Sequence, residues 1–138
     1  MSPQRAASPR TILLVDDDST VVQALKTILR RRGYEVLAAE TLEEAIAAAR
    51  VVSELDLLVV DAVMPHMSGP ELAEILLFLR PKMKILFITG LDCLTIRLAF
   101  NRPFEFLQKP FSVGVLLSKV QEMLEEPSEN ARETESEN

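Results

Sequence analysis

The sequence predicts an α/β fold: a doubly wound, five-stranded parallel sheet with the repeating order (βα)5. Two observations support this fold. Short runs that are apolar at nearly every position are typical of strands covered on both faces. Between these runs lie longer stretches in which apolar residues recur at helical spacing. The chain has 138 residues and is 48% hydrophobic, which suits one such domain. Right-handed crossovers would then place helices on both faces of the sheet.

Five segments are expected to be strands. Thr11–Val15, Leu57–Val60 and Ile85–Ile88 are the apolar runs, and they suit the buried middle of the sheet. Tyr34–Ala39 is more mixed and suits an edge strand, and Phe104–Leu107 is a short fifth strand. Helical stretches separate each strand from the next, as crossovers between parallel strands require.

The first two helices have recognisable ends. Apolar residues share one face of the first helix: Val21, Val22, Leu25, Ile28 and Leu29. Asp18 directly precedes that helix and is a favoured N-cap residue, while Gly33 can end it. Thr41 and Glu44 have the spacing of a capping box, so the second helix is expected to begin there.

Three further helices complete the pattern. Gly69 and Pro70 are expected to start the third helix, with the proline at its first position. Leu91–Phe100 is expected to form the fourth helix, and Ser112 can cap the last one. The third and last helices carry apolar faces, made by Leu72, Ile75, Leu76 and Leu79 and by Val113, Leu116, Leu117, Val120 and Leu124.

Composition excludes several classes of function. The net charge is −6, and Arg30–Arg32 is the only basic run, so a nucleic-acid-binding face is not expected. That run lies at the end of a predicted helix, where cations interact favourably with the dipole. Cys93 is the single cysteine and cannot form an internal disulfide, which favours a reducing, cytoplasmic setting. No apolar run approaches the ~18 residues of a membrane span, and the N-terminus lacks a signal-peptide core.

The predicted folded unit comprises residues 11–126. Residues 1–10 are polar and contain proline, and residues 127–138 form an acidic stretch without large apolar side chains. Both ends are expected to be disordered because they cannot bury enough apolar surface. No DNA-binding or enzymatic domain is expected after residue 126.

Polar side chains follow four of the expected strands: Asp16, Asp17, Asp18, Asp61, Thr89 and Lys109. In a parallel sheet, ligands bind at the carboxyl ends of the strands. Clustered carboxylates there repel one another unless a cation intervenes, and a hard divalent ion such as Mg²⁺ (or Mn²⁺) suits them. A lysine and a hydroxyl can contact phosphoryl oxygens, and a carboxylate can accept the phosphoryl group. Together these groups indicate phosphoryl transfer.

Four stretches in this order carry a family resemblance: ILLVDDD, VVDAVMPHMSG, ILFIT and FLQKPF. The sequence resembles the receiver domain of two-component response regulators. VVDAVMPHMSGPEL with FLQKPF most resembles receivers of hybrid sensor histidine kinases, so the chain is either a stand-alone receiver or a piece of such a kinase. The resemblance implies a flavodoxin-like strand order 2-1-3-4-5. It also implies a phosphorylation-activated switch, not a multi-turnover enzyme.

The resemblance further implies partners. A histidine kinase or a phosphotransfer domain would supply the phosphoryl group, and an unidentified downstream protein would receive the signal. The family's usual output and dimer surface comprises the fourth helix, the last strand and the last helix, so a homodimer is one possible assembly.

The resemblance assigns a role to each site residue. Asp61 would be the phosphoacceptor. Asp16 and Asp17 would hold Mg²⁺ together with Asp61, and the backbone carbonyl of Val63 would be a further ligand. Asp18 is better explained as the helix cap.

The remaining roles concern the response to phosphorylation. The hydroxyl of Thr89 would move toward the phosphoryl group and report its presence, and Lys109 would hold one of the phosphoryl oxygens. Phe106 would be the switch residue, an aromatic side chain that moves between an inward and an outward pocket. The resemblance also implies a cis peptide bond between Lys109 and Pro110.

The sequence departs from the family pattern at three places. Phe106 stands where tyrosine is common, so this ring has no hydroxyl. Asn101–Pro103 stands where the family usually has a small Gly-Ala pair before the last strand, and the interval from Thr89 to Lys109 is shorter than is usual in the family. Both differences predict a short, shifted or irregular fourth helix. Val63 and Leu91 are apolar at positions that influence the hydrolytic water, which predicts slow self-dephosphorylation.

Two alternatives remain open at this stage. Asp16–Thr20 also matches the nucleophile motif of haloacid dehalogenase-type hydrolases, with Asp16 as nucleophile and Asp18 as general acid. That family has a further acidic pair after a later strand, whereas only Asp92 is near here. The chain could also be a pseudo-receiver that acts only as an interaction module. His66, the only histidine, lacks metal-ligand spacing and is expected to face solvent.

Overall fold

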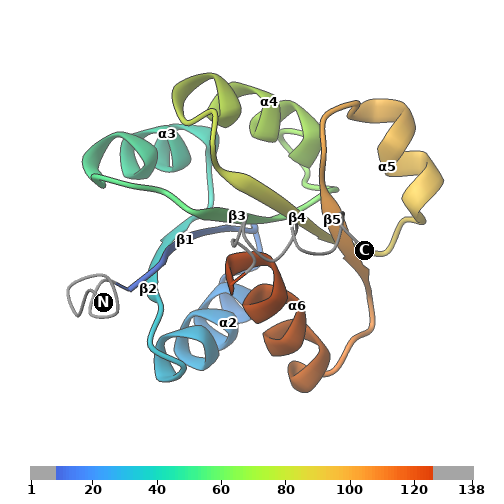
Figure 1. The fold of residues 1–138 in the computed structure, drawn as a ribbon. Coiled ribbons are helices and arrows are strands. Elements are labelled where there is room, and N and C mark those ends of the chain that lie inside the picture. The colour runs from blue at the N-terminus through green and yellow to red at the C-terminus, as the bar shows by residue number, and fades with distance from the viewer. Residues whose placement is uncertain (1–8, 126–138) are drawn as a thin grey trace, which may run out of the picture.

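Strands and helices alternate along the computed structural model, which describes residues 9–125 (Figure 1). The elements are β1 Thr11–Val15, α2 Ser19–Arg31, β2 Glu35–Ala39, α3 Leu42–Val51, β3 Leu57–Asp61, α4 Gly69–Leu79, β4 Lys84–Thr89, α5 Cys93–Ala99, β5 Glu105–Gln108 and α6 Val113–Glu125. Every predicted strand is confirmed to within one residue at each end. The predictions of disorder at the two ends concern residues that, apart from residues 9 and 10, lie outside the described part.

The sheet has five parallel strands in the order β2-β1-β3-β4-β5, which confirms the predicted fold class and strand order. Its register aligns the carboxyl ends of the strands. Val15 pairs with Val60, so Asp16 follows β1 beside Asp61, the last residue of β3. Thr89 pairs with Gln108, so Lys109 directly follows β5 next to the end of β4. The polar residues of four strands therefore meet at one edge.

Two helical layers cover the sheet, with α3, α4 and α5 on one face and α2 and α6 on the other (Figure 1). Side chains of alternate strand residues pack in two separate hydrophobic cores, one on each face of the sheet. Leu58 and Val60 belong to the core that contains α3–α5 residues, whereas Leu57 and Val59 belong to the α2–α6 core. All four side chains are fully buried, which explains why this strand is apolar at every position. Each contributes roughly 1.5–3 kcal/mol through burial.

The predicted ends of the first helix are confirmed. The carboxylate of Asp18 accepts hydrogen bonds from the backbone N–H groups of Thr20 and Val21, so Asp18 is the N-cap of α2. Gly33 has φ +97°, a left-handed conformation in which a side chain would be strained. Its N–H donates to the carbonyl of Arg30, and this turn ends the helix.

Other caps follow the predictions with two differences. Thr41 and Ser112 cap α3 and α6 with their hydroxyl oxygens, as predicted. The carboxylate of Glu44 accepts a hydrogen bond from the N–H of Glu40, one residue earlier than a standard capping box. Ser68 caps α4, so Pro70 is the second helical residue and not the first.

Helix α5 is short, as the departure at Asn101–Pro103 predicts. It has seven residues, and its only buried side chain is that of Ile96. Asp92 caps it, which excludes Leu91 and Asp92 from the helix predicted over Leu91–Phe100. After α5 the chain is extended at Phe100, whose buried ring packs edge-on against Phe87. No helix in the described part is long and apolar enough to span a membrane.

Candidate functional site

Three carboxylates converge at the carboxyl ends of β1 and β3. One oxygen from each of Asp16, Asp17 and Asp61 lies within 4.8 Å of the others. Asp16 and Asp61 are buried, with 1% and 8% of their surface exposed, whereas Asp17 faces solvent. The cluster therefore has a buried inner side and an open mouth.

Asp16 is held in place by the backbone. Its Oδ1 accepts a hydrogen bond of 3.0 Å from the N–H of Asp18, and its own N–H donates to the carbonyl of Ala39. Its Oδ2 is buried without a hydrogen-bond partner among the described residues. The pKa of Asp16 is raised to about 6, chiefly because burial disfavours the charged form; the N–H of Asp18 lowers the pKa and the charge of Asp61 raises it.

This donor set fits a divalent cation. A buried carboxylate oxygen without a partner costs free energy, and a cation at the cluster would satisfy it and offset the mutual repulsion. Carboxylate oxygens and solvent access are the features that Mg²⁺ prefers, since it retains several waters. The acidic pocket of receiver domains generally binds Mg²⁺, and the three clustered aspartates provide such a pocket here.

Both oxygens of Asp61 already have partners. The Nζ of Lys109 lies 3.1 Å from Oδ2, and the N–H of Val63 donates to Oδ1 over 2.9 Å. The Lys109–Pro110 peptide bond is cis, and the N–H of Lys109 donates to the carbonyl of Thr89 over 2.7 Å. The lysine that the sequence places after the last strand thus reaches the carboxylate 48 residues earlier in the chain.

Thr89 and Phe106 lie farther into the fold. Thr89 is fully buried at the end of β4, and its Oγ1 accepts a hydrogen bond of 2.9 Å from the N–H of Leu91. This contact connects the hydroxyl to the loop before α5. Phe106 is half-buried and packs against the core beneath α3, α4 and α5. The roles of Thr89, Phe106 and the Val63 carbonyl stay predictions.

Other residues that the sequence singles out lie apart from this cluster. Asp18 caps α2, and Asp92 caps α5 by accepting hydrogen bonds from the N–H and hydroxyl of Thr95. His66 is exposed in the loop between β3 and α4, as predicted. Asp92 therefore does not supply the second acidic group that the hydrolase alternative needs.

Sequence reasoning missed the structural role of Gly69. A Cβ at this position would lie 2.3 Å from the backbone oxygen of Asp61 and 2.7 Å from the Cα of Ala62. Only glycine permits this approach of α4 to the end of β3. The signal was present in the sequence as a glycine directly after a capping serine, but it indicated a helix start and nothing about Asp61.

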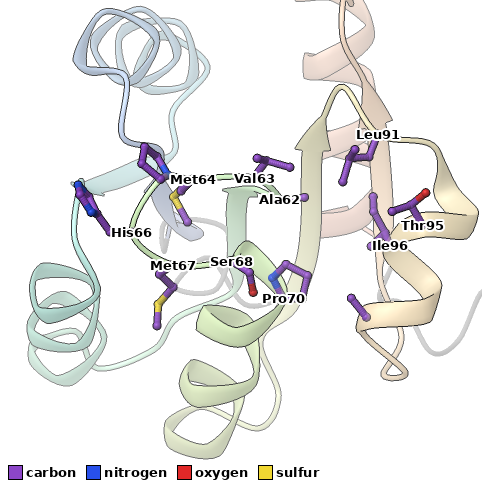
Figure 2. Close-up of a pocket in the computed structure, with 12 residues that line it drawn as sticks. Ala62, Val63, Met64, His66, Met67, Ser68, Pro70, Leu91, Thr95 and Ile96 are labelled. Carbon is purple, nitrogen blue, oxygen red and sulfur yellow. The ribbon is translucent and has the colours of Figure 1, made fainter.

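Sequence reasoning also missed a groove between α5 and the loop after β3. It has a volume of about 490 Å³, and its lining is mostly apolar. Figure 2 shows Val63, Met64 and Met67 on the loop side and Leu91 and Ile96 on the α5 side. The two apolar residues singled out beside the site, Val63 and Leu91, thus belong to opposite walls of one groove.

Comparison with known families identifies the chain. Residues 12–121 match the response regulator receiver domain, so the chain belongs to that family. The general function of the family is that of a phosphorylation-activated signalling switch in two-component systems. Its members interact with histidine kinases or phosphotransfer proteins. This assignment sets aside the hydrolase alternative.

Two curated relatives come from Brucella abortus (strain 2308). The chain is 38% identical to sensor kinase CckA over 118 residues, which are 83% of this chain but only 12% of that kinase. It is 34% identical to the response regulator receiver protein CpdR, over 83% of this chain and 97% of that protein. The match thus spans a small part of one relative and nearly all of the other.

Solved structures agree with the fold. The chemotaxis protein CheY4 of Vibrio cholerae superposes with a TM-score of 0.78 at 27% identity, covering 84% of this chain and 99% of that one. The receiver domain of hybrid histidine kinase CckA superposes with a TM-score of 0.71 at 32% identity, covering 83% and 99%. The resemblance to hybrid-kinase receivers is therefore confirmed.

Proposed function

We propose that Asp61 accepts a phosphoryl group from the phosphohistidine of a histidine kinase or phosphotransfer domain. One observation carries the proposal, namely that Asp61 lies both in the carboxylate cluster with Asp16 and Asp17 and 3.1 Å from the ammonium of Lys109. The acceptor thus has a cation site on one side and a fixed positive charge on the other. Phosphoryl transfer depends on such positioning and charge neutralisation.

In the proposed reaction, a carboxylate oxygen of Asp61 forms a bond to phosphorus. The bond between phosphorus and the histidine nitrogen breaks, and the imidazole leaves with the electron pair. Lys109 moves from the carboxylate to an oxygen of the transferred group, and the hydroxyl of Thr89 donates to another. The chain promotes its own phosphorylation and slow dephosphorylation without turning over a free substrate.

The proposed cation is Mg²⁺, or Mn²⁺ in its place. Asp16, Asp17 and Asp61 would hold it with the backbone carbonyl of Val63. When bound, the ion would neutralise the carboxylates and the phosphoryl oxygens. The buried, unpaired Oδ2 of Asp16 supports this assignment.

The proposed response begins at Thr89. If its hydroxyl turns toward the phosphoryl group, its hydrogen bond with the N–H of Leu91 changes, and the loop before α5 changes with it. Phe106 and the surface formed by α5, β5 and α6 would then present a different face to a downstream protein. Such a charge-driven bias between two states is general for phosphorylation switches.

The remaining proposals concern the whole protein. Residues 11–126 are proposed to act as the receiver unit, in the cytoplasm, without direct binding to nucleic acid or membrane. A phosphotransfer profile against candidate histidine kinases would identify the donor.

Phosphorylation with acetyl phosphate and Mg²⁺ tests the acceptor. Mass spectrometry should find one phosphoryl group on the parent chain and none on Asp61→Asn. Asp18→Asn is the matched control, because Asp18 neighbours the cluster but caps α2, and it should be labelled like the parent. Label retained in Asp61→Asn and lost in Asp16→Asn would overturn the proposal.

The lifetime of the phosphorylated state should be long. Val63 is 56% exposed and Leu91 lies on the opposite wall of the groove, and neither side chain can orient a water molecule by hydrogen bonding. In a phosphate-release assay, Val63→Asn should shorten the lifetime about tenfold, with Val51→Asn as an exposed control far from the site. Rapid decay of the parent chain would contradict this prediction.

A further inference from the structure

The loop between β4 and α5 contains a peptide group that is held by two side chains. The carbonyl of Gly90 and the N–H of Leu91 belong to this one planar peptide. The N–H donates to Oγ1 of Thr89 over 2.9 Å, and the carbonyl accepts a hydrogen bond of 3.4 Å from Nε2 of Gln108. Both polar atoms of the peptide are therefore bonded to side chains.

The two side chains come from the ends of neighbouring strands. Thr89 is the last residue of β4, Gln108 is the last residue of β5, and the register of the sheet pairs them. The N–H and the carbonyl of a trans peptide point in opposite directions, so the peptide is held from two sides. Gln108 thus connects the end of β5 to the loop that carries α5.

The contact fixes which end of the Gln108 amide faces Gly90. A carbonyl oxygen only accepts hydrogen bonds, so the opposite orientation of the amide would place two acceptors against each other. The distance of 3.4 Å is long for this type of bond and the side chain is exposed, so the bond is weak. We expect it to change an equilibrium constant by about threefold, near the lower end for hydrogen bonds in proteins.

The packing around this peptide is open. A Cβ added to Gly90 would meet no atom within 4 Å, and Leu91 is only half-buried. The helix that follows, α5, buries the side chain of Ile96 alone. Elements with so little buried apolar surface move at low cost. The two hydrogen bonds therefore contribute much of what sets the orientation of the Gly90–Leu91 peptide.

The peptide links Gln108 to the proposed response. In that response the hydroxyl of Thr89 turns toward the phosphoryl group on Asp61, and its hydrogen bond with the N–H of Leu91 changes. Because the peptide is planar, the carbonyl of Gly90 turns together with that N–H. The hydrogen bond from Gln108 resists the movement that phosphorylation drives.

We infer that Gln108 is a positioning residue that opposes the response to phosphorylation by holding the carbonyl of Gly90. The inference rests on the proposed roles of Asp61 and Thr89, and it adds a residue outside the carboxylate cluster. The bond biases the chain toward its unphosphorylated arrangement. A ligand that favours the other arrangement must overcome this bias, so loss of the amide should raise its apparent affinity by the same factor.

Titration of the 138-residue chain with beryllofluoride, a phosphoryl analogue, tests the inference in the presence of Mg²⁺. Gln108→Met is similar in size and lacks the donor, and calorimetry should show that it binds beryllofluoride about threefold more tightly than the parent. Its affinity for Mg²⁺ alone should be unchanged, because Gln108 lies outside the carboxylate cluster. A merely structural role would not separate these two affinities.

Gln121→Met is the matched control. Gln121 is also exposed and its Nε2 donates over 3.3 Å, but to the carboxylate of Glu125 on α6. This variant should match the parent in both titrations. Gln108→Asn keeps the amide but is one methylene shorter, so it cannot reach Gly90 and should resemble Gln108→Met.

Amide hydrogen exchange, followed by NMR without beryllofluoride, tests the contact itself. In Gln108→Met the amide of Leu91 should exchange about threefold faster than in the parent, because the peptide opens more often. The amide of Ile88, inside β4, should keep its rate, which separates local opening from a loss of global stability.

The outcomes distinguish this inference from the proposed function. A parent that binds no beryllofluoride in Mg²⁺ would overturn the proposed function and this inference with it. If the parent binds beryllofluoride and Gln108→Met binds it equally, the proposed function stands and the inference is wrong. The inference is also wrong if Gln108→Asn behaves like the parent, since the effect would then come from polarity and not from the contact with Gly90.

Discussion

The connections β3–α4 and β4–α5 stand side by side at the carboxyl edge of the sheet but are built differently. After β3, helix α4 approaches so closely that a Cβ on Gly69 would overlap the backbone of Asp61. After β4, the space around Gly90 is open, and α5 is anchored by the single buried side chain of Ile96. One connection is fixed by packing, whereas the other is held by few contacts.

The difference suits the two tasks that the proposed function requires. Asp61 needs a fixed position relative to the other carboxylates and Lys109, and dense backbone packing supplies it. A helix that responds to phosphorylation must instead shift at low cost, and elements with little buried apolar surface do so most easily. The hydrogen bond between Thr89 and Leu91 joins the end of β4 to the loop that carries α5.

The largest expected effect comes from Gly69→Ala. The new Cβ would lie 2.3 Å from a backbone oxygen, and backbone cannot yield as a flexible side chain can. We expect a loss of at least about 3 kcal/mol in the free energy of unfolding, measured by urea denaturation. Gly90→Ala is the control and should stay within about 0.5 kcal/mol, since a Cβ added there would meet no atom within 4 Å and the φ of Gly90 is not positive. If Gly69→Ala and Gly90→Ala lowered the free energy of unfolding equally, the proposed difference in packing between the two connections would be wrong.

Truncation of Ile96 should have the next largest effect. This side chain is 1% exposed, and Ile96→Ala should cost about 3 kcal/mol by removing the main anchor of α5. Leu98 lies on the same helix and is 81% exposed, so Leu98→Ala should change the free energy of unfolding by less than about 0.5 kcal/mol. Hydrogen exchange should show opening of α5 in Ile96→Ala while α4 stays protected. Uniform loss of protection would mean that α5 is not a separate unit.

Asp16→Asn should stabilise the metal-free protein. The pKa of Asp16 in the fold is about 6, above its ordinary value of 3.8, so the protonated form favours folding. That contribution is complete below pH 4 and is lost as the pH rises through about 6. In EDTA at pH 7.5 the variant should therefore be more stable than the parent by about 2–3 kcal/mol, and near pH 4 the two should converge.

Mg²⁺ should reverse this order. Thermal melts should show that Mg²⁺ stabilises the parent but not Asp16→Asn. If Asp16→Asn is less stable than the parent in EDTA at pH 7.5, then the buried Oδ2 of Asp16 is not a source of instability and the assignment is wrong.

Much of the fold was predictable from local patterns. Strands such as Leu57–Asp61 are covered on both faces, so their apolar runs stand out from the helical periodicity around them. Caps such as Asp18 and Ser112 were predictable because a cap depends on residues two or three positions away. For α5 the sequence predicted only a departure from the family pattern and not the length of the helix, since the end of the helix depends on how Phe100 packs.

The sequence by itself determined the order of strands and helices and the chemical groups that follow each strand. Both depend on spacing along the chain, and parallel strands bring those groups to one edge whatever their exact distances. Only the tertiary structure decided that Lys109 contacts Asp61, that one oxygen of Asp16 is buried without a partner within residues 9–125, and that Gly69 permits the close approach of α4. These features depend on register and on approach between segments far apart in the chain, which no local pattern encodes.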